Sequence, residues 1–469
     1  MEYQKTLEEA KKDFDNEILP ALEEFVRIDN LSPSFDPNWE TNGKAEKAGM
    51  HLINWAKSQG IKGLKAELYK EPGKTHMVFI EIESQGIDKT ILLYGHFDKQ
   101  PALGEWAEGL YPNKPVLKDG LLYGRGASDD GYALFAFIES IKLIQNQNLK
   151  HGKIIITLES GEESGSADLV PLLISLKDRI GNPDLMVCMD SGCKDYSSFW
   201  LTTSLRGAAN FELEIQCLKE DVHSGEGSGV APDSFTILRM LLDRLEDSKT
   251  SKVIVPINVE IPKYRIEDAK KLGDYLKEKT VNDLIKLEDG VKPLSEDYQE
   301  ALLNNTWRPS ITIIGLTGLP KAEGASNVLR KNLKATISIR LPPTLNCKDA
   351  EKVVIDTLTK NPPYNAKITA KCLVSMNGWA AKDMNPCLKK SFAESSKFLF
   401  GKDYYNCGEG GSIPFVSQLG ELYSKCEILV TGVLGPNSNA HCTNECLNID
   451  YTIKMIVALS HAIYDFSNQ

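Results

Sequence analysis

The sequence predicts an α/β protein with a mostly parallel central sheet flanked by helices. Uninterrupted apolar runs at 90–95, 153–159 and 185–189 are typical of strands that are covered on both faces. A clear helical pattern over about 132–146 lies between the first two runs. In open α/β sheets, ligand sites lie just beyond the carboxyl ends of the strands.

Polar residues follow these strands at what should be one rim of the sheet. They are His96 and Asp98 after the first strand, Asp129 before the helix, Glu162 and Glu163 after the second strand, and Asp190 after the third. Neighbouring carboxylates repel one another unless cations hold them, and acids with a histidine suit a divalent metal. Taken alone, a histidine beside a carboxylate is more often structural, and aspartates at a helix start are usually caps.

Composition is ordinary for a globular protein of 469 residues, with 42% hydrophobic and 25% charged residues, and the length suggests two or three domains. The net charge of -11 argues against nucleic acid or an anionic membrane as a partner. The sequence shows no secretory signal, and no apolar run approaches the roughly 20 residues of a membrane span. Ten scattered cysteines without a secretory signal favour free thiols and a cytoplasmic protein.

The remaining elements of the first domain come from both ends of the chain. Apolar spacing predicts helices at 5–27, 44–58, 387–400 and 450–466 and strands at 65–69, 76–82 and 427–433. The glycine-rich segment 408–414 opens a further helix, where backbone amides could hold a carboxylate. Ser412 as a plain helix cap explains that segment equally well.

The middle of the chain has a different pattern. A half-buried strand at 209–217 begins a series of elements in the order β-α-β-β-α-β, which is the ferredoxin-like unit. The later elements are expected at 233–246, 311–316, 332–341, 348–360 and 366–374, with a lysine-rich insertion at 250–308. We therefore expect a domain at 206–376 inserted into a domain formed by 1–205 and 377–469.

Eight short motifs occur in a fixed order along nearly the whole chain. They are GHFDKQP (95–101), LLYGRGASDDG (121–131), ESGEESGS (159–166), MDSG (189–192), DVHSG (221–225), SIR (338–340), GEGGSIP (408–414) and NAHCTNE (439–445). Together they resemble the co-catalytic metallopeptidases that include carnosinases, aminoacylases and succinyl-diaminopimelate desuccinylases. The similarity is greatest to the carnosinase-like dipeptidase branch. It implies a catalytic domain with an inserted lid domain, and homodimers formed through the lid.

The resemblance also implies a dinuclear metal centre. One ion would be held by His96, Asp129 and Asp190 and the other by Asp129, Glu163 and His441, with Asp129 bridging. The two divalent ions in each subunit would be Zn²⁺, with Mn²⁺ or Co²⁺ as alternatives. The resemblance further implies that the peptide bond between Asp129 and Asp130 is cis.

Catalytic and substrate-binding roles follow from the same resemblance. Asp98 would orient His96, and Glu162 would be the general base for a water that bridges the metals. His223 resembles a lid histidine that stabilises the oxyanion in the partner's site. Arg340, with Ser412 and Gly411 of the glycine-rich loop, would bind the substrate carboxylate.

The expected function is hydrolysis of an amide bond in a small carboxylate-bearing substrate, foremost a dipeptide. A desuccinylase or another N-acyl-amino-acid deacylase is an alternative, and a catalytically inactive amino-acid-binding or scaffold protein is a third. The chain departs from the family pattern near the expected substrate pockets rather than at the metal ligands. These departures are at Lys99, Gly131-Tyr132, Arg330, Gly408 and Cys442-Thr443.

Overall fold

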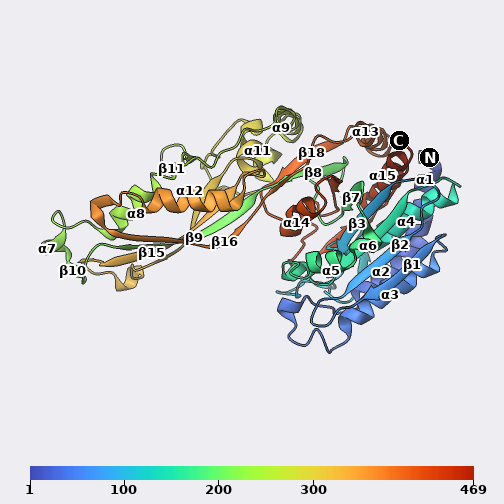
Figure 1. Cartoon of the computed structure of the whole chain (residues 1–469), viewed down its shortest axis with the longest axis horizontal. Helices are drawn as coiled ribbons and strands as arrows, with labels where there is room; N and C mark the ends of the chain where they lie inside the picture. The colour runs from blue at the N-terminus through green and yellow to red at the C-terminus, as the bar shows by residue number, and fades with distance from the viewer. The chain divides into compact units, whose positions relative to one another are not determined.

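A computed structural model of the chain describes residues 1–469, apart from the side chain of Pro414 (Figure 1). By its internal contacts the chain forms two compact units. The first consists of Met1–Thr203, Ala381–Asn406 and Gln418–Gln469, and the second of Ser204–Ala380 and Cys407–Ser417. None of the described helices is both long and apolar enough to span a membrane.

The first unit is built on a mixed sheet with strand order β1-β2-β6-β3-β7-β19-β8. Its strands are β1 (Leu64–Tyr69), β2 (Met77–Ile82), β3 (Thr90–His96), β6 (Lys153–Glu159), β7 (Leu185–Cys188), β8 (Trp200–Leu205) and β19 (Glu427–Val430). The inner strands β6, β3, β7 and β19 are parallel, whereas the outer pairs are antiparallel. The predicted α/β fold with a central sheet is confirmed, and each predicted buried run is an inner strand.

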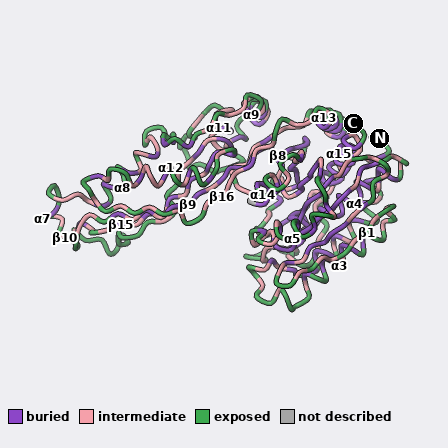
Figure 2. The backbone as a smooth tube through the Cα atoms, viewed as in Figure 1, coloured by how far each residue is buried: buried purple, intermediate pink, exposed green. Residues whose placement is uncertain are grey.

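Helices pack against this sheet and against one another. They are α1 (Tyr3–Asp13), α2 (Leu19–Val26), α3 (Lys44–Ser58), α4 (Ala133–Asn146), α5 (Leu169–Ser175), α6 (Lys177–Ile180), α13 (Pro386–Phe400) and α15 (Ile449–Ser467), while α14 (Pro414–Leu422) belongs partly to each unit. Helix α4 contacts β3 and β6, and α15 contacts α4, α13 and α1. Both α4 and α15 are buried along most of their length, so they form the core beside the sheet (Figure 2).

The helix expected at 5–27 is interrupted. A π-helical turn at Phe14–Ile18 separates α1 from α2, and Pro20 lies in the first turn of α2. Proline has no amide hydrogen to donate to the preceding turn, so the regular helical hydrogen bonds cannot continue through it.

A small antiparallel sheet connects two loops that are far apart in the sequence. Its order is β20-β5-β4, with β4 at Val116–Lys118, β5 at Leu121–Tyr123 and β20 at Cys446–Asn448. Cys446 pairs with Tyr123, so the segment that ends at Glu445 runs beside the segment that begins at Gly124. This pairing brings the loop of Asp129 to the loop of His441.

The second unit has the expected β-α-β-β-α-β order. Its sheet has the order β13-β15-β9-β16 and is antiparallel throughout, with β9 at Gly207–Gln216, β13 at Ser310–Thr317, β15 at Asn332–Leu341 and β16 at Lys367–Met376. Helices α8 (Ser234–Leu242) and α12 (Cys347–Thr359) pack on one face of it (Figure 1). Alternate side chains of β9 and β15 are buried beneath them, as period-two patterning predicts.

The lysine-rich insertion forms structure that its composition did not indicate. It contains the short strand β12 (Lys252–Val253) and the helices α9 (Lys263–Leu276), α10 (Lys279–Asn282) and α11 (Tyr298–Thr306), and the short strand β11 (Glu246–Asp247) lies just before it. The remaining short elements of this unit are β10 (Val222–His223), α7 (Ser224–Gly227), β14 (Val328–Leu329) and β17 (Trp379–Ala380). Helix α9 packs on α11, so the insertion carries its own helical pair.

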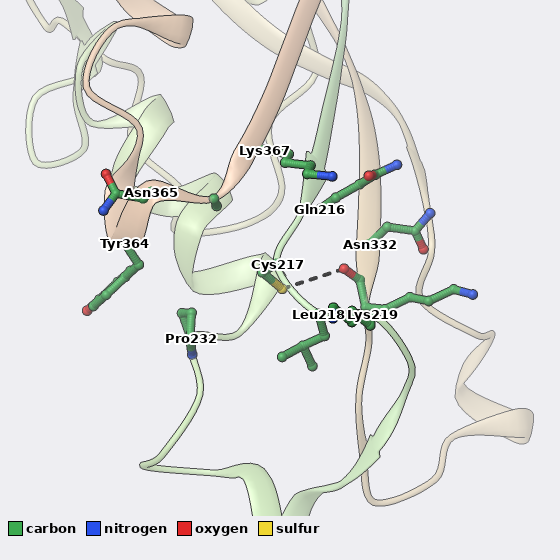
Figure 3. A pocket seen from close by; sticks show the side chains of 11 residues that line it. Gln216, Cys217, Leu218, Lys219, Pro232, Asn332, Tyr364, Asn365 and Lys367 are labelled. Atoms are coloured by element: carbon green, nitrogen blue, oxygen red, sulfur yellow. Dashed lines mark hydrogen bonds between the residues drawn. The ribbon is translucent and has the colours of Figure 1, made fainter.

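A pocket of about 510 Å³ lies where β9 ends and β15 and β16 begin (Figure 3). Its lining includes Lys219, Lys331 and Lys367 and the thiol of Cys217, whose sulfur lies 3.6 Å from the carbonyl oxygen of Lys331. None of the sequence-predicted site residues lines it.

Candidate metal centre

The expected metal ligands of the first unit converge beyond the ends of its parallel strands. His96 ends β3, Glu162 and Glu163 begin a 3₁₀ turn after β6, and Asp190 follows β7. Because these strands are parallel neighbours, their carboxyl ends lie at one edge of the sheet. Three groups of side chains there each offer ligand atoms within 4.8 Å of one another: His96, Asp129 and Asp190; Asp129, Glu163 and His441; and His96, Glu162 and Glu163.

Asp129 lies at the centre of this arrangement. Its Oδ1 is 3.1 Å from Nε2 of His96, and its Oδ2 is 2.9 Å from Nε2 of His441. The same nitrogen of His441 is 3.1 Å from Oε2 of Glu163. One carboxylate therefore presents a separate oxygen to each of two imidazoles, which is how a ligand shared by two cations would be placed.

Asp98 connects the histidine to the glutamate turn. Its two oxygens accept the backbone amides of Glu162, at 3.2 Å, and Glu163, at 3.0 Å. Nδ1 of His96 lies 3.4 Å from Oδ1 of Asp98, which is longer than a good hydrogen bond. The role of Asp98 that the structure shows most directly is therefore to fix the turn that carries Glu162 and Glu163.

The buried charges of this cluster fit divalent cations. Burial, reinforced by the carboxylates of Asp129 and Glu163, raises the pKa of Asp190 to about 7. Burial and the neighbouring Asp190 likewise raise the pKa of Glu162 well above its usual range. Hydrogen bonds to Asp129 and Glu163 raise the pKa of His441 to about 10. The raised pKa values of Asp190 and Glu162 indicate that the neighbouring side chains do not balance the negative charges of these carboxylates, and divalent ions would supply the missing positive charge. The donor set of imidazole nitrogens and carboxylate oxygens suits zinc, manganese or cobalt.

The backbone around Asp129 is closely packed. The bond between Asp129 and Asp130 is cis, as the resemblance implied. Oδ2 of Asp130 accepts the amide of His96 at 3.2 Å. A Cβ at Gly95 would lie 2.6 Å from that same oxygen, so only glycine fits before His96.

Sequence reasoning missed a buried carboxylate, Glu445, that organises both ligand loops. Its Oε1 accepts the amides of Gly126, Ser128 and Asp129 at 3.0, 3.1 and 3.2 Å. Its Oε2 is 2.5 Å from Nη1 of Arg125. Nη2 of Arg125 donates to the carbonyl of Cys442 at 2.9 Å, directly after His441. The ion pair of Arg125 and Glu445 therefore ties the loop of Asp129 to the loop of His441. The sequence signal for this contact is that Arg125 and Glu445 each lie in a motif that also contains an expected metal ligand.

Gln100 and Lys99 hold the loop after His96. The Gln100 side-chain amide donates to Oε2 of Glu163 at 2.8 Å. The buried Nζ of Lys99 donates to the carbonyls of Phe25 and Ile28 at 2.9 and 2.7 Å, at the end of α2. Burial lowers the pKa of Lys99 to about 7. This lysine, a departure from the family pattern, anchors the loop to the N-terminal helices.

The residues expected to bind substrate all belong to the second unit, including Gly411 and Ser412, which were expected in the catalytic domain. Nη1 of Arg340 lies 3.3 Å from the hydroxyl of Ser412, and that hydroxyl donates to the carbonyl of Arg206. Gly411 precedes Ser412 and is exposed. His223 is exposed at the end of β10, and its Nδ1 accepts the amide of Gly225 at 3.1 Å. The structure brings Arg340 and Ser412 together, while His223 lies on a separate two-stranded sheet.

The model of peptidase family M20/M25/M40 matches residues 92–465, which include every expected ligand of the centre. The chain belongs to this family. It is therefore a metal-dependent peptidase, and the resemblance to the co-catalytic metallopeptidases is confirmed.

Curated relatives of this M20 peptidase, and solved structures of similar proteins, match most of its length. It is 28% identical to a cysteinylglycine-S-conjugate dipeptidase of Corynebacterium striatum, over 81% of each chain. It is 27% identical to the human Beta-Ala-His dipeptidase, over 79% of this chain and 74% of the relative. The crystal structure of human carnosine dipeptidase 1 superposes with a TM-score of 0.70 and 22% identity, covering 100% of this chain and 99% of the other. That likeness confirms the fold.

Removing the charge of Glu445 tests its place in the centre. We expect Glu445→Gln to weaken metal binding about 10- to 100-fold, because an amide cannot accept all the donors that now fix Asp129. Competition with a chelator of known affinity measures this constant. Glu24→Gln, at a glutamate whose side chain is 64% exposed, is the matched control. Unchanged metal affinity in folded Glu445→Gln protein would show that the Glu445 carboxylate does not position the expected ligands.

Proposed function

We propose that this M20 peptidase is a dipeptidase that uses two divalent cations, Zn²⁺ in the first place and Mn²⁺ or Co²⁺ otherwise. The observation that carries the proposal is the placement of Asp129 between His96 and His441. Asp190 would complete the ligands of one ion and Glu163 those of the other. The names of the relatives, which are dipeptidases, support a dipeptide rather than a larger substrate.

The residues of the centre divide the chemical work among themselves. When bound, the cations would polarise the scissile carbonyl and make water a stronger nucleophile. Glu162 would accept the proton of the attacking water and deliver it to the leaving nitrogen, so it acts first as base and then as acid. Asp98 would hold the backbone of Glu162 in place through the amide hydrogen bond described above.

The second unit would supply substrate contacts. The planar guanidinium of Arg340 would bind the carboxylate of the substrate, assisted by Ser412 and the backbone at Gly411. His223 would stabilise the oxyanion in the site of the other subunit of a homodimer formed through the lid.

We propose a catalytic domain at 1–205 with 377–469 and a lid at 206–376. None of the ten cysteines, all in the described structure, forms a disulfide, which fits a reducing compartment such as the cytoplasm.

Glu162→Gln separates proton transfer from metal binding. We expect it to retain two metal ions per subunit and to lose about 10²- to 10⁴-fold in kcat, because an amide cannot carry the proton. Elemental analysis and steady-state kinetics measure the two properties. A variant with near-normal turnover would rule out Glu162 as the base, and one that loses a metal would make Glu162 a ligand, as its group with His96 and Glu163 permits.

A substrate panel tests the dipeptidase assignment. Metal-free protein should be inactive, and added Zn²⁺, Mn²⁺ or Co²⁺ should restore hydrolysis of dipeptides more than that of N-acetyl amino acids or N-succinyl-diaminopimelate. Product release measured by chromatography gives kcat/KM for each substrate. Faster cleavage of the acylated compounds would identify the protein as a deacylase instead.

Mixing two inactive variants tests the role of His223. Each of His223→Ala and Glu162→Ala should be inactive alone, because each destroys both sites of the dimer. After subunit exchange, mixed dimers should regain one intact site, giving about a quarter of wild-type turnover at equal amounts. Exchange is verified with differently tagged subunits, and mixed dimers without activity would place His223 outside the partner's site.

A further inference from the structure

Two arginines meet at one end of the four-stranded sheet in the second unit. Arg206 directly precedes β9, and Arg340 is the penultimate residue of β15. Across the sheet Arg340 pairs with Ala208 of β9 on one side and with Ser310 of β13 on the other. This is the end of β9 opposite to the pocket of Figure 3.

All hydrogen-bond partners of the Arg206 side chain are neutral. Its Nε donates to the carbonyl of Gly410 at 3.0 Å, and its Nη1 to the hydroxyl of Ser310 at 3.1 Å. Longer contacts of Nη1 reach the carbonyls of Asn304, at 3.4 Å, and Arg308, at 3.3 Å. Nη2 makes no hydrogen bond to any described residue. The guanidinium is thus oriented by neutral groups while one nitrogen remains available.

No described carboxylate forms an ion pair with Arg206 or Arg340. Glu300, on the neighbouring helix α11, pairs with Arg308 at 2.9 Å instead. Glu409, the last residue of strand β18 (Tyr405–Glu409), contacts the thiol of Cys407 at 4.0 Å. Burial and the positive charge of Arg340 lower the pKa of Arg206 to about 10.

Ser412 joins the two arginines into one site. Its hydroxyl accepts from Nη1 of Arg340 and donates to the carbonyl of Arg206. Arg206 is only 7% exposed, and a buried charge without a counter-charge is costly. Two adjacent cations of this kind are balanced by two negative charges, whereas a single carboxylate would leave one positive charge uncompensated.

We propose that Arg206 and Arg340 form a single site for two carboxylates, so the preferred substrates end in an aspartate or glutamate residue. Arg340 binds one carboxylate, and Arg206 determines specificity by requiring a second one. The inference rests on the proposed function for its substrate class. The binding property itself does not depend on turnover.

Binding of free amino acids tests this site without catalysis. Calorimetry on the full-length, metal-loaded protein compares L-glutamate with L-glutamine, which differ by one carboxylate. We expect glutamate to bind at least about tenfold more tightly, because the additional contact is a charge-assisted hydrogen bond. Arg206→Gln should bring the ratio close to one, and Arg206→Lys, which keeps the charge but loses the fork, should give an intermediate ratio. Arg239→Gln, at an exposed arginine of α8, is the control and should leave the ratio unchanged.

The same variants are then assayed on Ala-Glu and Ala-Gln. The kcat/KM ratio should follow the binding ratio. Equal binding of glutamate and glutamine by the wild-type protein would overturn the proposal, and so would a preference that folded Arg206→Gln retains. The comparison in the wild-type protein can overturn the proposal even if neither Arg206 variant folds. Glutamate preference in a protein that cleaves no dipeptide would uphold this site and refute the proposed function.

Discussion

The shared carboxylate of Asp129 is the constraint on which the first unit depends. One oxygen faces His96 at 3.1 Å and the other faces His441 at 2.9 Å, although these histidines are 345 positions apart in the chain. Such a carboxylate has to be fixed in rotation as well as position, because a small turn would withdraw one oxygen from its partner. The fold fixes the backbone at this residue through Glu445, whose Oε1 accepts the amides of Gly126, Ser128 and Asp129.

The location of the centre was predictable, because continuous apolar runs are typical of the covered middle strands of a sheet, and ligand sites lie beyond the carboxyl ends of such strands. The parallel strands β3, β6 and β7 therefore deliver His96, the Glu162–Glu163 turn and Asp190 to one edge. His441 was not predictable in this way, because it lies in a loop with positive φ and without periodic pattern. Its position follows from the pairing of β20 with β5, which short strands of three residues do not reveal in sequence.

The residues that hold the ligands were also beyond sequence reasoning. Glu445, Gln100 and Lys99 act through hydrogen bonds to backbone groups and side chains that are distant in the chain, and such contacts impose no spacing. The same limit explains the interrupted helix at 5–27, where apolar periodicity continued across a local π turn. The helices of the 250–308 insertion were missed because their charged composition resembles that of a loop.

Each unit carries a charge that its own residues do not balance. In the first unit four buried or partly buried carboxylates, Asp129, Glu162, Glu163 and Asp190, gather around two imidazoles. In the second unit Arg206 and Arg340 lie together among neutral acceptors. Because burial makes uncompensated charge costly, both arrangements favour ligands of opposite sign. The proposed pair of cations would balance the charge of the first arrangement, and the proposed carboxylate-bearing substrate would balance that of the second. The proposed chemistry and the proposed substrate class thus rest on the same electrostatic requirement.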